Sequence, residues 1–292
     1  MTRTPKSSRS IAFLSVFAAL IFCGVLPAQS PQNPSPMVEH TRAHPRIEES
    51  TPPGRREPLD LGTLFIPAGL KLKSSTPLLI FFHGGTWLPE VAAARDGNTA
   101  VISIQIGTGS GVYTRAFADP QRFLNLVHEA EKKAGVKFSP VTVGGWSAGC
   151  GAIREILKSP ESYALIRKVL LIDGIHTDYI GEKPGPLESQ LGTDNLQVFL
   201  QLGRDAIAGK KSVLITHSEI FPGTYASTTE TADYLVKELG ITRRAVVKWG
   251  PMGTQELSEA RQGKFLLIGF AGNSAPDHVD QLHSLPQFLK WL

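Results

Sequence analysis

The sequence predicts an α/β fold: a doubly wound, mostly parallel β-sheet with helices on both faces. Two observations predict this class. Continuous apolar runs such as "PLLIFF" and "KVLLI" recur along the chain, and such runs are typical of strands that are buried on both faces. Amphipathic segments that favour helix lie between several of these runs, and alternating strands and helices favour a parallel sheet with helical crossovers.

The expected elements follow one another from residue 58 to residue 292, which is a suitable length for one large domain. Strands are expected at residues 62–68, 77–82, 99–107, 141–146, 167–173, 211–217, 244–249 and 264–271. Helices are expected at residues 119–134, 149–157, 195–207, 227–239 and 277–292. Residues 174–209 also contain an irregular loop, which makes this region a candidate cap segment over a site.

Two segments that precede this domain have a different composition. Residues 1–30 have a basic start, an apolar run and small residues near Ser30, which predicts a signal peptide that is cleaved there. The alternative is an uncleaved membrane anchor, but Gly24 and Pro27 interrupt the apolar run. We therefore expect a secreted or periplasmic protein with no stable membrane span after processing. Residues 31–57 are rich in proline and charge and predict a flexible linker.

Charge and metal-binding residue types exclude several kinds of partner. The whole chain has a formal charge of +4, and most of this charge lies in residues 1–30, so no nucleic-acid partner is expected. The histidines and cysteines lack metal-ligand spacing, and we expect neither a metal nor a cofactor. Cys150 is the only cysteine that remains after cleavage, and we expect it to be a small packing residue.

A serine lies between glycines where a strand becomes a helix. Residues 145–149, "GWSAG", fit the pattern G-x-S-x-G around Ser147. In this pattern the serine occupies a strained turn that exposes its hydroxyl, and the glycines leave room for close backbone contacts. A tight packing turn is the alternative explanation. The apolar strand before the motif and the helix after it favour a nucleophile.

Together with a second motif, this segment resembles the α/β-hydrolase family over most of residues 60–292. The second motif is "FFHGGTW", which resembles the oxyanion loop of lipases and esterases. The resemblance implies that the backbone N–H groups of Gly85, Thr86 and Ala148 form an oxyanion hole. Thr86 replaces the third glycine of the fuller family motif. His83 is expected to support the loop rather than to transfer protons.

The resemblance also implies a histidine base later in the chain than Ser147. His278 is the preferred candidate because it follows the last expected strand, in a loop that leads into the final helix. His283 is expected inside that helix as a packing or surface residue. His176 and His217 follow earlier strands and are expected to line the pocket.

The orienting carboxylate has two open candidates. Asp173 ends an apolar strand, where an unpaired charge is unfavourable. Glu219 follows the strand after which this family more often carries its acid. Asp277 is adjacent to His278 in sequence and is expected to point elsewhere.

The motifs predict an exported serine hydrolase that cleaves a carboxylic ester through an acyl-enzyme intermediate. The substrate is expected to be a small-molecule or polymer-borne ester, and Trp87 and Trp146 are candidate pocket walls. Two alternatives remain open. The same site can serve an amidase, a peptidase or an acyltransferase, and a hydrolase-like fold can also serve as a non-catalytic binding protein.

Overall fold

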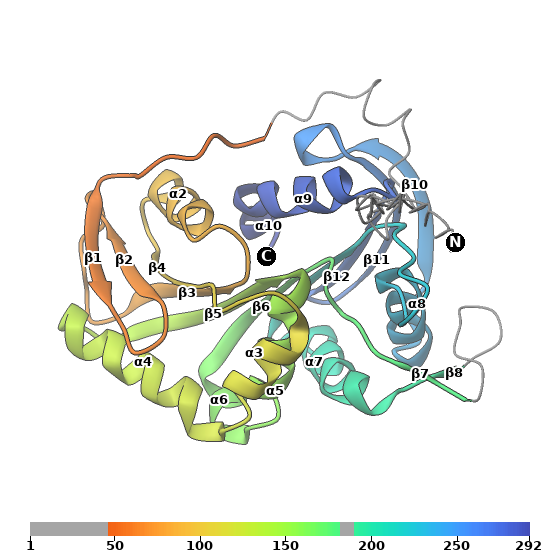
Figure 1. Cartoon of the computed structure of the whole chain (residues 1–292), viewed down its shortest axis with the longest axis horizontal. Helices are drawn as coiled ribbons and strands as arrows, with labels where there is room; N and C mark the ends of the chain where they lie inside the picture. The colour runs from red at the N-terminus through yellow and green to blue at the C-terminus, as the bar shows by residue number, and fades with distance from the viewer. Residues whose placement is uncertain (1–45, 182–189) are drawn as a thin grey trace, which may run out of the picture. The chain divides into compact units, whose positions relative to one another are not determined.

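The computed structural model describes residues 46–181 and 190–292, in which ten strands form one sheet (Figure 1). Six central strands are parallel, and the strands at both ends of the sheet are antiparallel. In spatial order the strands are β1 (Gly54–Pro58), β2 (Thr63–Pro67), β4 (Ala100–Ile104), β3 (Thr76–Phe82), β5 (Phe138–Trp146), β6 (Ile166–Ile172), β9 (Ser212–His217), β12 (Phe265–Phe270), β11 (Gln255–Gln262) and β10 (Arg243–Trp249).

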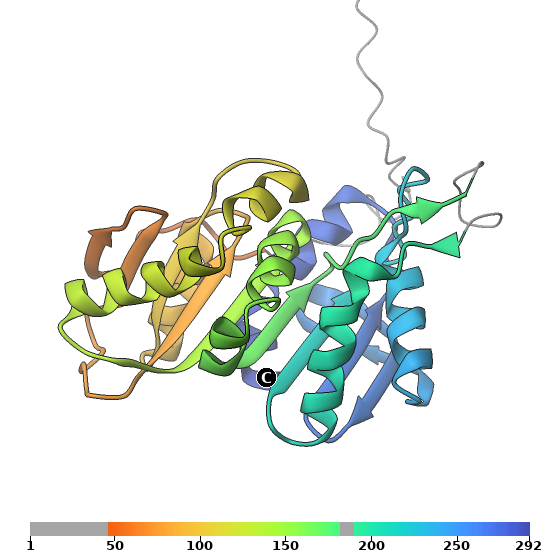
Figure 2. The ribbon, with the colours of Figure 1, turned by 90° about the horizontal axis from the view of Figure 1, so that it is seen from below.

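Helices cover both faces of this sheet (Figures 1 and 2). One face carries α3 (Ser110–Ala116), α4 (Pro120–Ala134), α5 (Cys150–Ile156), α6 (Pro160–Leu165), α7 (Gln197–Ile207) and α8 (Thr228–Glu238). The other face carries α2 (Trp87–Asp96), α9 (Ala275–His283) and α10 (Leu285–Trp291). The expected doubly wound, mostly parallel α/β architecture is therefore confirmed.

The central strands contribute side chains to two separate cores. In β3, Leu78, Ile80 and Phe82 point into the larger core beneath α4, α5, α7 and α8. Leu79 and Phe81 point to the opposite side, into the core beneath α2, α9 and α10. Because successive side chains of a strand alternate between faces, a strand between two helical layers must be apolar at every position. This requirement explains the continuous apolar runs in the sequence.

Local signals set several helix ends where the sequence indicates them. The Asp119 side chain accepts a hydrogen bond from the Gln121 N–H at the start of α4, and Gly135 ends this helix in the left-handed conformation. Ser227 and Glu230 form a reciprocal capping box at the start of α8. These contacts satisfy backbone groups that have no partner within the helix.

The domain begins earlier than the expected boundary at residue 58. Residues 54–58 form β1, which pairs with β2, and Ile47 is only 7% exposed. Arg46 contributes an ion pair with Asp280 of α9. Residues 54–57 of the expected linker therefore belong to the sheet, because a polar edge strand takes its stability from its partner and shows no apolar pattern. Residues 31–45 of the expected linker and residues 1–30 lie outside the described residues.

Two other expectations differ from the structure, and one strand was not expected. The candidate cap at 174–209 includes α7, which instead packs on the sheet through buried residues such as Phe199 and Leu202. The same region contains a two-stranded sheet of β7 (Tyr179–Ile180) and β8 (Gln190–Leu191). The expected final helix is two helices, α9 and α10, which meet at Ser284. The polar strand β11 gave no apolar signal and was not expected.

Over the described ranges, the structure contains no helix with the length and apolar character needed to cross a membrane.

Candidate active site

Three candidate residues meet at one edge of the sheet. Ser147 directly follows β5, Asp173 directly follows β6, and His278 lies in the first turn of α9, after β12. These strands are all parallel, so their carboxyl ends lie at the same edge, where α/β sheets usually bind ligands. His278 is therefore helical, which agrees with the expected helix at residues 277–292 and not with a place in the loop before it.

The Ser147 backbone is strained. Its φ angle is +49°, in the left-handed region that non-glycine residues rarely adopt. A methyl group on Gly149 would lie 2.1 Å from the carbonyl oxygen of Phe82, and one on Gly145 would lie 2.9 Å from the carbonyl carbon of Gly149. The turn is consequently possible only with glycine on both sides of the serine. The expectation of a strained corner at Ser147 is confirmed.

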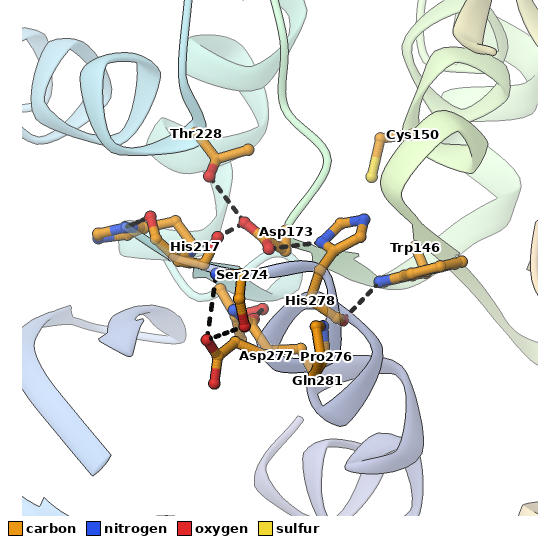
Figure 3. A network of polar contacts seen from close by, with 12 residues as sticks. Trp146, Cys150, Asp173, His217, Thr228, Ser274, Pro276, Asp277, His278 and Gln281 are labelled. Carbon is orange, nitrogen blue, oxygen red and sulfur yellow. Dashed lines mark hydrogen bonds and ion pairs between the residues drawn. The ribbon is translucent and has the colours of Figure 1, made fainter. Parts of the chain in front are cut away.

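Asp173 and His278 form a short hydrogen bond. The Asp173 Oδ2 atom lies 2.7 Å from the His278 Nδ1 atom (Figure 3). The aspartate side chain is only 2% exposed, whereas that of the histidine is 19% exposed. The histidine is therefore held from the protein side by a buried carboxylate and remains accessible at its outer edge.

Two further donors hold the other oxygen of Asp173. Its Oδ1 atom accepts hydrogen bonds from the Ser218 backbone N–H, at 2.8 Å, and from the Thr228 hydroxyl, at 2.7 Å. Burial alone would raise the pKa of Asp173, but the adjacent His278 and the hydrogen bonds from His278, Thr228 and Ser218 lower this pKa well below its usual range. Asp173 is therefore ionised at neutral pH.

Trp146 lies between two histidine rings and contacts both. Its ring centroid is 5.2 Å from that of His83, in a stacked arrangement, and 4.5 Å from that of His278. The indole N–H also donates a hydrogen bond of 3.0 Å to the His278 carbonyl oxygen (Figure 3). Trp146 thereby holds both the ring and the backbone of His278, and its neighbour in the chain is Ser147.

The loop after β3 is held by a network that the sequence did not indicate. The His83 Nδ1 atom lies 3.1 Å from the Gln105 Oε1 atom and 3.0 Å from the Tyr113 hydroxyl. The Gln105 Oε1 atom also accepts the Gly84 N–H at 3.0 Å. Thr86 is the N-terminal cap residue of α2. The N–H groups of Gly85 and Thr86 therefore lie where a helix leaves donors without intrahelical partners.

A small cavity brings the three residues together. Its volume is about 60 Å³. It is lined by Ser147, Asp173, His176, Ser218, Ile220, Pro222, Tyr225, Thr228 and His278. His176 thus lies where the sequence placed it, and the sequence reasoning missed Ser218, Tyr225 and Thr228. Ser218 directly follows β9, which was its only signal, whereas Tyr225 lies in the next loop and Thr228 begins α8.

The remaining candidates lie elsewhere. Among the described residues, the Glu219 carboxylate has no hydrogen bond to a histidine. His217 does not line the cavity; it is buried against Arg243, Thr229 and the Ser218 carbonyl group.

Three other residues have packing contacts. The Nδ1 atom of His283 accepts a hydrogen bond from the Ile47 N–H, and its ring packs beside Trp87 in α2. Trp87 belongs to the core beneath this helix and does not line the cavity. Cys150 is buried next to the turn, and burial raises the pKa of its thiol.

A larger cavity of about 860 Å³ lies away from Ser147. It is bounded by α2, α10 and residues near the amino-terminal ends of β3 and β5, and none of the three clustered residues lines it. Within the described ranges, no group of three or more His, Cys, Asp or Glu side chains is placed to hold a metal ion.

Comparison with known proteins gave structural matches only. No protein-family model and no curated protein matches the chain. The acetyl xylan esterase of Aspergillus awamori is 18% identical with a TM-score of 0.43, and the match covers 77% of this chain and 93% of the esterase. Carboxyl esterase 2 of Tuber melanosporum is 18% identical with a TM-score of 0.45, covering 86% of this chain and 90% of the esterase. Dienelactone hydrolase of Anabaena variabilis is 14% identical with a TM-score of 0.42, covering 84% of this chain and 100% of the hydrolase.

At this level of similarity the fold assignment depends on the topology of the chain itself. A serine on a strained strand-to-helix turn lies at the carboxyl edge of a doubly wound sheet. Aspartate and histidine follow it in that chain order and contact one another. This chain has the α/β-hydrolase fold. The expected resemblance is therefore confirmed at the level of the fold, and the α/β-hydrolase arrangement explains why these loops meet.

Proposed function

We propose that this chain is a serine hydrolase that cleaves a carboxylic ester through an acyl-enzyme intermediate. Ser147 is the nucleophile, His278 the general base and acid, and Asp173 the carboxylate that orients the histidine. The observation that carries the proposal is the 2.7 Å bond between Asp173 and His278 beside the strained turn of Ser147. Nucleophile, base and orienting group are the three parts that this chemistry requires.

The proposed reaction has two half-reactions. The Ser147 Oγ atom attacks the ester carbonyl carbon while its proton passes to the Nε2 atom of His278. The histidine then gives this proton to the leaving alcohol as the C–O bond breaks, and the acyl group remains on Ser147. A water molecule, activated by His278, attacks the acyl-enzyme and releases the carboxylic acid.

Two features of the site would stabilise the charges that form in this reaction. Asp173 stays ionised and hydrogen-bonded, so it stabilises the positive charge that His278 gains. The N–H groups of Gly85, Thr86 and Ala148 are the proposed donors to the oxyanion. The Gly84 N–H is already bonded to Gln105, which makes it unsuitable for this role.

The proposed enzyme is also exported. Support comes from the sequence of residues 1–30, whose basic start, apolar run and small residues near Ser30 favour cleavage by a signal peptidase.

A fluorophosphonate probe tests the nucleophile directly. The probe should label the wild-type protein, and mass spectrometry should locate the adduct on Ser147. The Ser147→Ala variant should not be labelled, and its kcat with p-nitrophenyl acetate should fall at least about 10³-fold. Its melting temperature should stay close to that of the wild type, because only a hydroxyl is removed. Labelling of another residue, or an active Ser147→Ala variant, would exclude the proposed mechanism.

A further inference from the structure

The cavity beside Ser147 restricts the size of the group that enters it. Its volume is about 60 Å³, which is room for a few water molecules at about 10–15 Å³ each, and the cavity is open on one side. Ile220, Pro222 and Tyr225 contribute part of its wall. A group of a few non-hydrogen atoms fits this space, and a longer chain would have to extend out of the open side of the cavity.

The lining of this cavity is polar. The Ser218 side chain is buried, with the residue 1% exposed, and its hydroxyl oxygen has no hydrogen-bond partner among the described residues. The Nδ1 atom of His176 is also buried and lacks such a partner in the described part of the chain. Both residues line the cavity. Both atoms are therefore available to a hydrogen-bonding group that enters the cavity, because a buried polar group without a partner lowers stability.

Size and polarity together define the group that fits. An alkyl group would fill the cavity but leave the Ser218 hydroxyl and the Nδ1 atom of His176 without partners. A hydroxymethyl group has the same number of non-hydrogen atoms as an ethyl group and adds a donor and an acceptor.

We propose that the ester substrate has a small, oxygen-bearing group that occupies this cavity and is recognised by Ser218 and His176. This inference rests on the proposed esterase function. The group belongs either to the acid, as in a glycolyl ester, or to the alcohol, as in a 2-hydroxyethyl ester.

A pair of substrates matched in size tests the acid. The p-nitrophenyl esters of glycolic and propionic acid are compared by their kcat/KM values, each divided by the rate constant of hydroxide-catalysed hydrolysis of that ester. We expect the corrected value for the glycolate to be about tenfold higher or more, because a site built for a hydroxyl discriminates against analogues that lack one. The octanoate should be the poorest substrate.

A second pair tests the alcohol. Acetate esters of ethylene glycol and of propanol have leaving groups of equal size, and their hydrolysis is followed by acid release. A preference of about tenfold for the glycol ester places the polar group on the alcohol. Corrected ratios near one in both pairs would overturn the inference.

Variants identify the residues responsible. Ser218→Ala keeps the backbone N–H that bonds to Asp173 and should reduce the preferred ratio at least about fivefold, with the larger loss in the kcat/KM value of the hydroxyl-bearing ester. His176→Phe keeps a ring and should act in the same direction. Ser75→Ala, which removes an exposed hydroxyl bonded to Ser139, is the control and should leave the ratio unchanged.

Ile220→Ala tests the size limit. Enlarging the cavity should raise the octanoate-to-acetate ratio of kcat/KM values by about tenfold; an unchanged ratio would contradict a wall at Ile220.

The inference and the esterase function fail in different ways. If no ester is cleaved and the fluorophosphonate does not label Ser147, the proposed function is wrong. If esters are cleaved but Ser218→Ala lowers both members of a pair equally, only the inference is wrong.

Discussion

His217 and His278 occupy neighbouring parts of the same sheet edge but have opposite surroundings. His217 ends β9 and faces the Arg243 guanidinium, whereas His278 follows β12 and faces the Asp173 carboxylate. Ser218 connects the two sites, because its N–H group bonds to Asp173 and its carbonyl group bonds to His217. Position after a strand therefore does not decide the role of a histidine; the charge of its neighbour does.

The pKa values of His217 and Asp173 reflect these different surroundings. Burial, together with the positive charge of Arg243, lowers the pKa of His217 to about 4, so this ring stays neutral at pH 7. Asp173 stays ionised and favours a positive charge on His278 during the proposed reaction. One histidine is suited to accept a proton, and the other is suited to a structural role.

Removing the carboxylate charge should have the largest effect. Asp173→Asn preserves the shape of the site but favours the wrong tautomer of His278, and in serine hydrolase triads this change costs about 10⁴ in kcat, or about 5 kcal/mol. Continuous assays with p-nitrophenyl acetate measure the loss. Glu219→Gln is the matched control and should change kcat less than about threefold. A severe loss in Glu219→Gln with a mild one in Asp173→Asn would reverse the assignment of the acid.

Lowering the pH should destabilise the folded protein through His217. In the unfolded chain a histidine has a pKa of about 6.5, so between this value and about 4 the unfolded state binds more protons than the folded state. The free energy of unfolding should therefore be highest above pH 6.5 and fall as the pH decreases towards 4, with about 3 kcal/mol attributable to His217. Burial also lowers the pKa of His83, His176 and His283, which adds to the same slope.

Urea unfolding at several pH values measures this slope. His217→Gln cannot be protonated in this range and should flatten the dependence, whereas His128→Gln in α4 is the control. An unchanged slope in His217→Gln would show that protonation of the wild-type His217 ring does not lower the free energy of unfolding.

Removing the hydrogen bond that Trp146 donates to the His278 carbonyl oxygen should have the smallest effect. Trp146→Phe keeps an aromatic ring between His83 and His278 but removes the N–H bond to the His278 carbonyl oxygen. We expect kcat to fall about tenfold, which corresponds to about 1.4 kcal/mol, with little change in KM. Trp291→Phe in α10 is the control. An effect on KM alone would argue that Trp146 contacts substrate instead of positioning the histidine.

The sequence by itself determined the class of fold and the strained serine turn. Strands buried on both faces must be apolar throughout, and the tight turn at Ser147 needs a glycine two residues before and two residues after it, so both features leave a local pattern. The helix ends at Asp119 and Ser227 are equally local, because a capping side chain bonds to backbone within three residues.

Only the tertiary structure decided which distant groups meet. Asp173 and Glu219 both follow strands and look equivalent in the sequence, but only Asp173 lies against His278, 105 residues away. The support of His83 by Gln105 and Tyr113, and the pairing of β1 with β2, likewise depend on the packing of separate segments. Such contacts leave no periodicity or spacing in the chain, because they join segments that only the folded sheet brings together. At the site, parallel strands bring their carboxyl ends to one edge.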